Sequence, residues 1–382
     1  MNWSETKYLI VGAGFFGAVI AREIAENMGK PVTIIDKRSH IGGNSYSEKD
    51  DETGIECHKY GSHIFHTSNK KVWDYINRFG SFNNYRHRVL SNHKGKMYHI
   101  PINLSTINNF YGKNFNPEQA KIFINNEIKK DGIVNPQNFE EKAISITGHK
   151  LYNAFIKGYT SKQWDTNLKK LPGSIISRLP FRYNYNFDYF IDLWQGIPIN
   201  GYTEIFKSIL NHRNITCILD IDYFKIKNYL PKNCFTVYTG PIDRFFKYKY
   251  GVLGWRTLKF EEHLVDVNDY QGNSVVNYPD LDVTYTRVHE FKHFLNNDAS
   301  TKNRTIIYKE YSSKATKNHD PYYPMNRNED MMKYNLYKND ASKLLNVIIG
   351  GRLGFYKYLD MHQIISSALS TYSKSIKPNY LQ

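Results

Sequence analysis

Three glycines near the start of the chain have the spacing that binds the pyrophosphate of a dinucleotide. Gly12, Gly14 and Gly17 stand between an apolar run at 7–11 and a segment with apolar residues at helical spacing, and a second apolar run ends in Asp36. In such a strand–turn–helix–strand unit the glycines permit a tight turn, close approach of the pyrophosphate and close packing of helix and strand. The helix N-terminus donates to the phosphate, and Asp36 would accept from both ribose hydroxyls and disfavour a 2′-phosphate.

The dinucleotide could be NAD or FAD, and two later stretches favour FAD. The stretch 37–44 directly after the acid contains a glycine pair ending at Gly43, where the backbone again has room to lie against a cofactor. The stretch 347–369 is predicted to form a strand, a glycine turn with Arg352 and a helix that begins near Asp360. A late unit of this kind closes over the isoalloxazine in folds of the glutathione-reductase type, although it could also simply complete the sheet.

Arginines outside charge runs are the second group of candidate binding residues. Arg178, Arg182, Arg287 and Arg352 stand in aromatic or glycine-rich surroundings. The fork of a guanidinium suits a diphosphate, so the arginines predict an anionic ligand. The alternative is that Arg178 and Arg287 face solvent and pair with nearby acids such as Glu290.

The chain lacks the motifs of most sites that use a metal or a protein nucleophile. It contains no HExxH, CxxC, GxSxG or Walker sequence. His63 and His66 have the spacing of a metal pair, but no third ligand is nearby, so we predict no metal site. Gly61 would let the backbone around His63 approach a cofactor, which leaves a flavin as the expected reactive centre.

Composition limits the class of protein. The 382 residues, 41% hydrophobic and 23% charged, are typical of a globular protein of two to three domains. The sequence has no long apolar span and no signal-peptide features, and its three cysteines show no pairing or ligand spacing. These features predict a cytoplasmic protein without membrane insertion. The net charge of +15 and 15% aromatic residues suit either nucleic acid or a nucleotide-bearing small molecule. Because the lysines are scattered rather than arranged in a stripe, we expect no nucleic acid.

The periodicity of the chain indicates an α/β fold with two insertions. A discontinuous FAD-binding Rossmann-like domain of the glutathione-reductase type is expected from residues 1–80, 200–240 and 335–382. A helical domain with a mobile substrate loop is expected at 100–177, where Asn116, Pro117 and Glu118 predict a helix N-terminus. An antiparallel sheet domain is expected from 81–99, 178–199 and 241–334. In it, the run 283–294 is strand-like, and 181–189 carries five aromatics at period two, which predicts a strand with an aromatic face.

Ten motifs in order along the chain resemble those of the bacterial type of UDP-galactopyranose mutase. They are GAGFFGAVIAREIAE, DKRSHIGGNSYSE, GSHIFHTSNK, KGYTSKQW, RLPFRYNYNFDYF, QGIPINGYT, YTGPIDRFF, VTYTRVHEFKH, PYYP and GRLGFYKYLDM. The resemblance implies an isomerase that interconverts UDP-galactopyranose and UDP-galactofuranose for surface polysaccharide. It implies a noncovalent FAD that is active when reduced: N5 attacks the anomeric carbon, UDP leaves, the sugar ring opens and recloses, and UDP returns without net redox change. An external reductant and a homodimer are implied as well.

The resemblance also assigns roles by position. Arg178 and Arg287 match the diphosphate arginines and, with His63 beside the flavin, are the implied catalytic residues. The implied substrate-binding residues are His87, Phe155, Ile156, Tyr159, Trp164, Tyr189, Asn277, Tyr323 and Tyr358. The implied cofactor-binding residues are Gly12, Gly14, Phe16, Gly17, Asp36, Lys37, Gly43, Asn44, His63, Ile64, Arg352, Asp360 and Met361. Asp165 and Ile156 replace a frequent Gly and a frequent Phe of the family, which puts loop mobility and uracil packing in question.

Three other functions are open to this sequence. A mutase for a related nucleotide sugar, such as UDP-N-acetylgalactosamine, would share every motif. An amine-oxidase-like flavoprotein would share the fold but would consume an oxidisable substrate and produce peroxide. A nucleic-acid-binding protein would show a steep salt dependence of its affinity.

Overall fold

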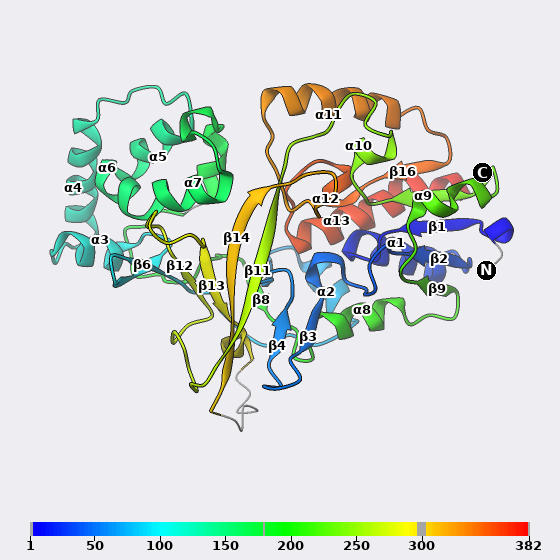
Figure 1. Ribbon diagram of the computed structural model, residues 1–382, viewed down its shortest axis with the longest axis horizontal. Coiled ribbons are helices and arrows are strands. Elements are labelled where there is room, and N and C mark those ends of the chain that lie inside the picture. The colour runs from blue at the N-terminus through cyan, green and yellow to red at the C-terminus, as the bar shows by residue number, and fades with distance from the viewer. Residues whose placement is uncertain (1–2, 179, 296–302, 381–382) are drawn as a thin grey trace.

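The computed structural model describes residues 3–178, 180–295 and 303–380, apart from the side chains of 177–178 and 379–380. A five-stranded parallel sheet forms one half of it, with strands in the order β16-β10-β1-β2-β9 (Figure 1). These strands are β1 (Tyr8–Val11), β2 (Val32–Ile35), β9 (Ile215–Ile218), β10 (Phe235–Tyr238) and β16 (Val347–Ile349). The chain therefore leaves this sheet after β2 and after β10 and returns to it each time.

Helix α1 (Phe15–Asn27) is the centre of the core on this sheet. It begins directly after the glycine turn and packs against α8 (Tyr202–Leu210) and α13 (Met361–Thr371). A Cβ at Gly17 would lie 2.0 Å from the carbonyl oxygen of Gly12, so α1 reaches β1 this closely only because residue 17 is glycine. Gly12 itself has φ +107°, a conformation that glycine adopts without strain. The roles predicted for these two glycines are confirmed.

A seven-stranded sheet in the order β15-β11-β14-β13-β12-β6-β7 forms the middle of the molecule (Figure 1). Its strands are β6 (Val89–His93), β7 (Lys96–Ile100), β11 (Trp255–Val265), β12 (Val275–Asn277), β13 (Arg287–Glu290), β14 (Thr305–Lys314) and β15 (Tyr323–Pro324). Its neighbours are antiparallel apart from β12 and β6, which run parallel. The strand predicted at 283–294 is mostly wrong. Only the four residues of β13 form a strand there, and they are followed by a 3-10 helix, η7 (Phe291–Phe294).

The aromatic strand predicted at 181–189 is wrong. These residues form no strand, and Phe181 makes a single bridge to Ile102. The side-chain oxygen of Asn184 accepts from the backbone N–H of Asn186 at 3.0 Å, and Asn186 accepts from that of Asp188 at 2.9 Å. Successive turns of this type compete with a strand ladder, which is why the alternation of aromatic and Asn/Asp residues does not produce one.

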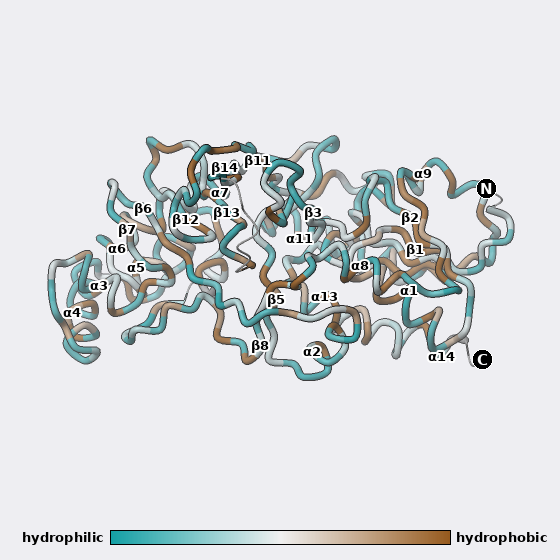
Figure 2. Tube along the Cα trace, turned by 90° about the horizontal axis from the view of Figure 1, so that it is seen from below, coloured by the Kyte–Doolittle hydropathy of each residue, from teal (hydrophilic) through white to brown (hydrophobic). Residues whose placement is uncertain are grey.

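The helical region lies at the opposite end of the elongated molecule from the parallel sheet (Figure 2). Its elements are α3 (Leu104–Tyr111), α4 (Pro117–Lys130), α5 (Phe139–Thr147), α6 (His149–Leu151), the π-helix η3 (Tyr152–Lys157) and α7 (Gly158–Trp164). The predicted helix start is confirmed, because Asn116 and Gln119 form a capping box with Pro117 in the first helical position.

Shorter elements complete the described chain. The remaining strands are β3 (Ser47–Lys49), β4 (Glu56–His58), β5 (Phe65–Thr67) and β8 (Trp194–Gly196), which pair as β3–β4 and β5–β8. The remaining helices are α2 (Lys70–Asn77), α9 (Tyr223–Ile226), α10 (Ile242–Phe245), α11 (Asn328–Ala341), α12 (Gly351–Gly354), α14 (Lys377–Tyr380), η1 (Trp3–Glu5), η2 (Gly43–Ser45), η4 (Leu168–Lys170), η5 (Gly173–Arg178), η6 (Lys227–Tyr229) and η8 (Tyr372–Ile376). Within the described ranges, no helix has the length and apolar character needed to cross a membrane.

Lys162 ties the helical region to the seven-stranded sheet. Its Nζ lies 2.6–2.9 Å from four backbone carbonyl oxygens in the loop between β12 and β13, those of Tyr278, Asp280, Val283 and Tyr285. One turn earlier, a Cβ at Gly158 would lie 2.1 Å from the carbonyl oxygen of Pro279. The close approach and the shared cation fix α7 relative to β12 and β13.

We expect Lys162→Met to destabilise the protein, because it leaves this group of carbonyls without their cation. Hydrogen bonds from a charged donor contribute about 1.5–3 kcal/mol each, so we expect a loss of at least about 2 kcal/mol in the free energy of unfolding. Thermal melts followed by circular dichroism measure it. Lys169→Met, at an exposed lysine of the following segment, is the control and should melt like the wild type. Equal melting temperatures for wild type and Lys162→Met would contradict the tether.

Candidate active site

One cavity of about 1500 Å³ brings together every site residue expected from the sequence except Arg178. The side chain of Arg178 lies outside the described residues, and only its backbone, at the end of η5, is placed. The expected cofactor-binding residues that line the cavity are Gly12, Gly14, Phe16, Gly17, Asp36, Lys37, Gly43, Asn44, His63, Ile64, Arg352, Asp360 and Met361. The other expected residues that line it are His87, Phe155, Ile156, Tyr159, Trp164, Tyr189, Asn277, Arg287, Tyr323 and Tyr358.

At the end of the cavity next to the parallel sheet, two glycine segments face each other at the start of α1. Gly14 is the N-cap of α1, and a Cβ on it would meet only the Cα of Gly43, at 3.8 Å. Gly43 has φ +57°, so the segment facing α1 also uses glycine's conformational freedom. The result is a backbone-lined slot at a helix N-terminus, where N–H groups and the helix dipole favour an anion. The slot fits a pyrophosphate.

Asp36, at the end of β2, has its carboxylate fixed by backbone donors. Oδ2 accepts from the N–H of Ala13 at 2.8 Å, and Oδ1 accepts from that of Arg38 at 2.9 Å. Arg38 also donates to Oδ1 of Asn44 at 3.0 Å and pairs with Asp320 at 2.7 Å, while Lys37 pairs with the same Asp320 at 2.6 Å. Sequence analysis missed Asp320, because only its place before the Pro-Tyr-Tyr-Pro motif marks it.

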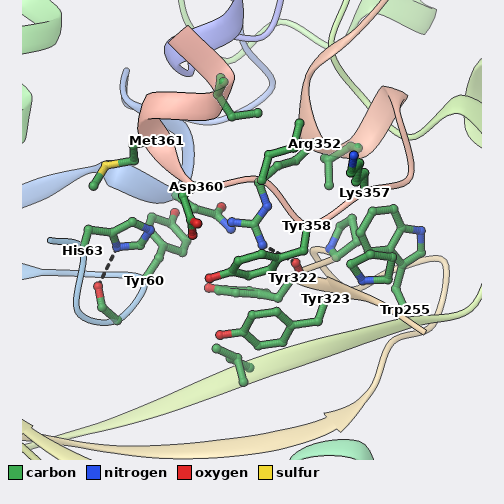
Figure 3. Close-up of a pocket in the computed structure, with 18 of the residues that line it drawn as sticks. Tyr60, His63, Trp255, Tyr322, Tyr323, Arg352, Lys357, Tyr358, Asp360 and Met361 are labelled. Carbon is green, nitrogen blue, oxygen red and sulfur yellow. Dashed lines mark hydrogen bonds between the residues drawn. The ribbon is translucent and has the colours of Figure 1, made fainter. Parts of the chain in front are cut away.

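The segment after β16 returns to the cavity, as the sequence predicts, and lines its middle (Figure 3). Nη2 of Arg352 donates to the carbonyl oxygen of Tyr322 at 2.5 Å, and its guanidinium lies 4.7 Å from the ring centre of Tyr358. The rings of Tyr358 and Tyr323 stack with centres 5.6 Å apart. Asp360 caps α13 beside them. Aromatic rings and a guanidinium therefore surround the space between the two ends of the cavity.

His63 and His66 have different partners. Nδ1 of His63 lies 2.7 Å from the carbonyl oxygen of Gly61, so this nitrogen carries the proton. Burial lowers the pKa of His63 to about 4, which keeps the ring neutral. Nδ1 of His66 instead lies 2.7 Å from Oδ2 of Asp192, and the His66 ring stacks on a phenylalanine. Among the described residues, the ligand atoms of His66 also lie within 4.8 Å of those of Asp360 and His362.

Arg287 and Glu310 form an ion pair at the other end of the cavity. They face each other directly across β13 and β14, and Nε of Arg287 lies 3.2 Å from Oε1 of Glu310. The contact is an ion pair without a well-aligned hydrogen bond, because Nε has no hydrogen-bond partner within the described part of the chain. Nη2 of Arg287 donates to the hydroxyl of Tyr159 on α7. Burial would lower the pKa of Arg287, but the charge of Glu310 together with the surrounding Tyr159, Tyr323 and Tyr189 raises it well above its usual value. The guanidinium is therefore a permanent cation in the cavity.

Glu310 is almost completely buried and was missed by sequence analysis. Its other oxygen, Oε2, lies 3.1 Å from Nε2 of His289. Burial pushes the pKa of Glu310 upward, but Arg287 and His289 together hold it below the ordinary value, so the group is a carboxylate. The sequence signal that could have revealed Glu310 is its place at period two after Ile306 and Tyr308, which puts an acid on the same face of the strand as two buried apolar residues. Glu290, considered as a partner of Arg287, is wrong in that role, since it accepts from backbone N–H groups of the 270–271 turn.

The cavity wall near Arg287 contains further residues expected to contact a nucleotide. Phe155 and Ile156 lie in the π-helix η3, and both line the cavity while packing in the core of the helical region. π-Helices are frequent at functional sites. Burial, followed by the charge of Arg287, lowers the pKa of His87 to about 3, so its ring is neutral. Asn277 pairs in register with Arg287, and its Oδ1 is buried without a partner within the described residues. A buried, unsatisfied acceptor beside a cation indicates a place for a polar ligand.

Asp165, at a position where the resemblance implies a frequent glycine, has a left-handed backbone. It ends α7 with φ +47°, which glycine adopts most readily and aspartate tolerates. Its Oδ2 lies 3.5 Å from Nη1 of the fully buried Arg256, whose Nε donates to the carbonyl oxygen of Gln163 at 3.0 Å. The ion pair accommodates this departure next to Trp164.

Fold and cavity together define a Rossmann-type dinucleotide-binding protein, and the comparisons identify its family. Residues 10–79 match the model of an NAD(P)-binding Rossmann-like domain, and residues 154–358 match that of UDP-galactopyranose mutase. A probable UDP-galactopyranose mutase of Klebsiella pneumoniae is 44% identical over 95% of this chain and 93% of its own length. A dTDP-fucopyranose mutase of Escherichia coli is 42% identical over 98% of this chain and 99% of its own. The chain therefore belongs to the UDP-galactopyranose mutase family and is an isomerase.

A solved structure has the same fold. The crystal structure of a reduced UDP-galactopyranose mutase covers 96% of this chain and 93% of its own, with a TM-score of 0.74 and 14% sequence identity. The expected fold class, a Rossmann-like domain with inserted helical and sheet regions, is confirmed.

We expect Gly14→Ala and Gly17→Ala to fail in different ways. At position 14 the new Cβ has open space, so the protein should fold but lose its bound dinucleotide, because the methyl group occupies the slot. At position 17 the Cβ would clash with the Gly12 carbonyl oxygen, and overpacking of this kind costs typically 1–3 kcal/mol of stability. The cofactor absorbance per protein and the melting temperature of the cofactor-free forms measure the two effects. Full cofactor content in Gly14→Ala would refute the slot.

Proposed function

We propose that the protein binds FAD and, with FAD reduced, interconverts UDP-galactopyranose and UDP-galactofuranose. The observation that carries the proposal is a single cavity that joins the dinucleotide slot at α1 to the Arg287–Glu310 pair and its surrounding tyrosines. Membership of the mutase family supports it. Reduced FAD supplies the nucleophile, N5, which agrees with the lack of a recognised nucleophile motif in the chain.

The chain's own residues would hold both molecules. The slot of Gly12, Gly14 and Gly43 would take the pyrophosphate of FAD, and Asp36 its ribose. On the flavin side we place His63, Ile64, Arg352, Asp360 and Met361, with Phe16, Lys37 and Asn44 completing the cofactor contacts. His63 stays neutral above about pH 4 and adds no charge there.

At the substrate end, the protein must hold the diphosphate of UDP while the sugar rearranges. It must then allow UDP to bond again to the anomeric carbon. Arg287 would supply the fork of donors for this, oriented by Glu310, and Arg178 would supply a second cation. Hydroxyls of Tyr189, Tyr323 and Tyr358 would donate to phosphate oxygens. The base and sugar contacts would come from His87, Phe155, Ile156, Tyr159, Trp164 and Asn277.

A second candidate substrate is dTDP-fucopyranose, because the Escherichia coli relative of that name is 42% identical along nearly the whole chain. This substrate differs from UDP-galactopyranose by the 5-methyl group of the base, the missing ribose 2′-hydroxyl and the missing 6-hydroxyl of the sugar. The same cavity and the same mechanism would serve both, and UDP-N-acetylgalactosamine is a third test substrate.

The proposal includes the setting of the enzyme. We place it in the cytoplasm as a homodimer that takes electrons from an external reductant and supplies galactofuranose for surface polysaccharide, with no nucleic-acid partner. The unpaired state of Cys57, Cys217 and Cys234 agrees with a reducing compartment.

Product analysis tests the proposed function directly. Dithionite-reduced protein should convert UDP-galactofuranose to UDP-galactopyranose, read by HPLC, without consuming reductant in proportion to product. The oxidised protein should be inactive. Parallel reactions with dTDP-fucofuranose and with the furanose form of UDP-N-acetylgalactosamine rank the substrates. A colourless protein that does not take up FAD but binds NAD, or equal activity in the oxidised state, would refute the proposal.

We expect Arg287→Ala and Arg178→Ala to lower kcat/KM by at least tens-fold, since each would lose charge-assisted bonds to the diphosphate and about 1.4 kcal/mol corresponds to tenfold. Lysine should rescue poorly because it lacks the fork. Steady-state kinetics and thermal melts of both variants, with the exposed Arg213→Ala as control, separate catalysis from stability. Normal turnover in either variant with FAD bound would remove that arginine from the site.

A further inference from the structure

A chain of polar contacts connects two parts of the cavity wall that are far apart in sequence. The hydroxyl of Ser62 lies 2.6 Å from Nδ1 of His289, and Nε2 of His289 lies 3.1 Å from Oε2 of Glu310. Glu310 pairs with Arg287, which in turn donates to Tyr159. Ser62, Glu310, Arg287 and Tyr159 line the cavity, whereas His289 is fully buried behind its wall.

The direction of each hydrogen bond in this chain is determined by the chemistry of its members. A carboxylate only accepts, so Nε2 of His289 must carry the proton that is donated to Glu310. Nδ1 is then the acceptor, and the hydroxyl of Ser62 donates to it. Burial lowers the pKa of His289 despite the neighbouring carboxylate, which agrees with a neutral ring in this one tautomer.

Strand register produces the arrangement. Arg287 and His289 are two residues apart on β13 and therefore on the same face, and Arg287 lies directly opposite Glu310 on β14. Ser62 comes from the turn between β4 and β5, next to Gly61 with φ +91° and next to His63. Its hydroxyl is the point at which the turn that carries His63 is bonded to the face that carries Arg287.

We propose that Ser62 and His289 are positioning residues, which hold the His63 turn on the cofactor side and Arg287 on the substrate side in one fixed arrangement. The inference rests on the proposed function, in which FAD lies beside His63 and the nucleotide diphosphate beside Arg287. Through Ser62, His289 would act on the turn, and through Glu310 it would act on the guanidinium. The two directions can be separated experimentally.

Two substitutions of His289 each keep one half of the chain. His289→Asn places an amide oxygen near the position of Nδ1, so it can accept from Ser62 but no longer donates to Glu310. His289→Gln places an amide nitrogen near the position of Nε2, so it can donate to Glu310 but no longer accepts from Ser62. Ser62→Ala removes the first contact and leaves His289 in place.

The holoenzyme is assayed with UDP as the binding probe, by titration calorimetry, and by the flavin absorption spectrum. His289→Asn should weaken UDP binding about tenfold, the cost of one mispositioned charge-assisted contact, with an unchanged flavin spectrum. His289→Gln and Ser62→Ala should keep the Kd for UDP within about twofold and shift the flavin spectrum. All three should lower kcat, whereas Val288→Ala, a buried apolar neighbour on the other face of β13, should lower only the melting temperature.

The outcomes distinguish this inference from the proposed function. Wild-type holoenzyme that binds no UDP overturns both. Wild-type holoenzyme that binds UDP, together with an unchanged Kd in His289→Asn or with Val288→Ala changing the Kd equally, overturns the inference alone. If neither His289 variant folds, Ser62→Ala decides, and an unchanged flavin spectrum and kcat in that variant overturn the inference.

Discussion

The ion pair between Arg287 and Glu310 is the interaction on which the proposed substrate end of the cavity depends. A carboxylate that is 2% exposed is tolerated only with a cation and hydrogen-bond donors, and removing one member of a buried pair typically costs about 3–5 kcal/mol. Here Arg287 supplies the cation, and His289 and Thr286 supply donors. The long pairing of β14 with β11 holds Glu310 in register, so the position of the cation follows from the sheet.

The two ends of the cavity differ in how far the sequence predicts them. The dinucleotide slot is local, because one turn and the helix after it contain Gly12, Gly14 and Gly17, and each glycine has a steric reason that the spacing already indicates. The helix start at Asn116 is predictable for the same reason. Glu310, His289 and Asp320 were missed, because their contacts depend on strand register and on distant loops. In the stretch 181–189, period-two aromatics were outweighed by asparagine side chains that bond to the backbone.

The names of two relatives point to different substrates, whereas the fold is shared even at low sequence identity. The two relatives of similar identity carry names with different bases and different sugars. A solved member keeps the fold at 14% identity. We therefore expect selection among nucleotide sugars to depend on individual side chains within this fold. Asp165 illustrates how the fold tolerates a change of side chain. The buried Arg256 next to it already donates to Gln163 and Ser312, and the exposed Asp165 carboxylate adds a further ion pair.

The order of strands in the parallel sheet has a consequence for folding during synthesis on the ribosome. β1 is completed by β10 on one side, and β10 in turn by β16, while Arg352 and Asp360 follow β16. The first glycine turn is synthesised well before Arg352 and Asp360, which belong to the proposed flavin side of the cavity. A nascent chain can thus present a pyrophosphate slot without the wall that would retain the cofactor. Secure capture of the cofactor would therefore wait for this later segment, and until β16 is made the exposed edge of β10 is a surface for chaperones to cover.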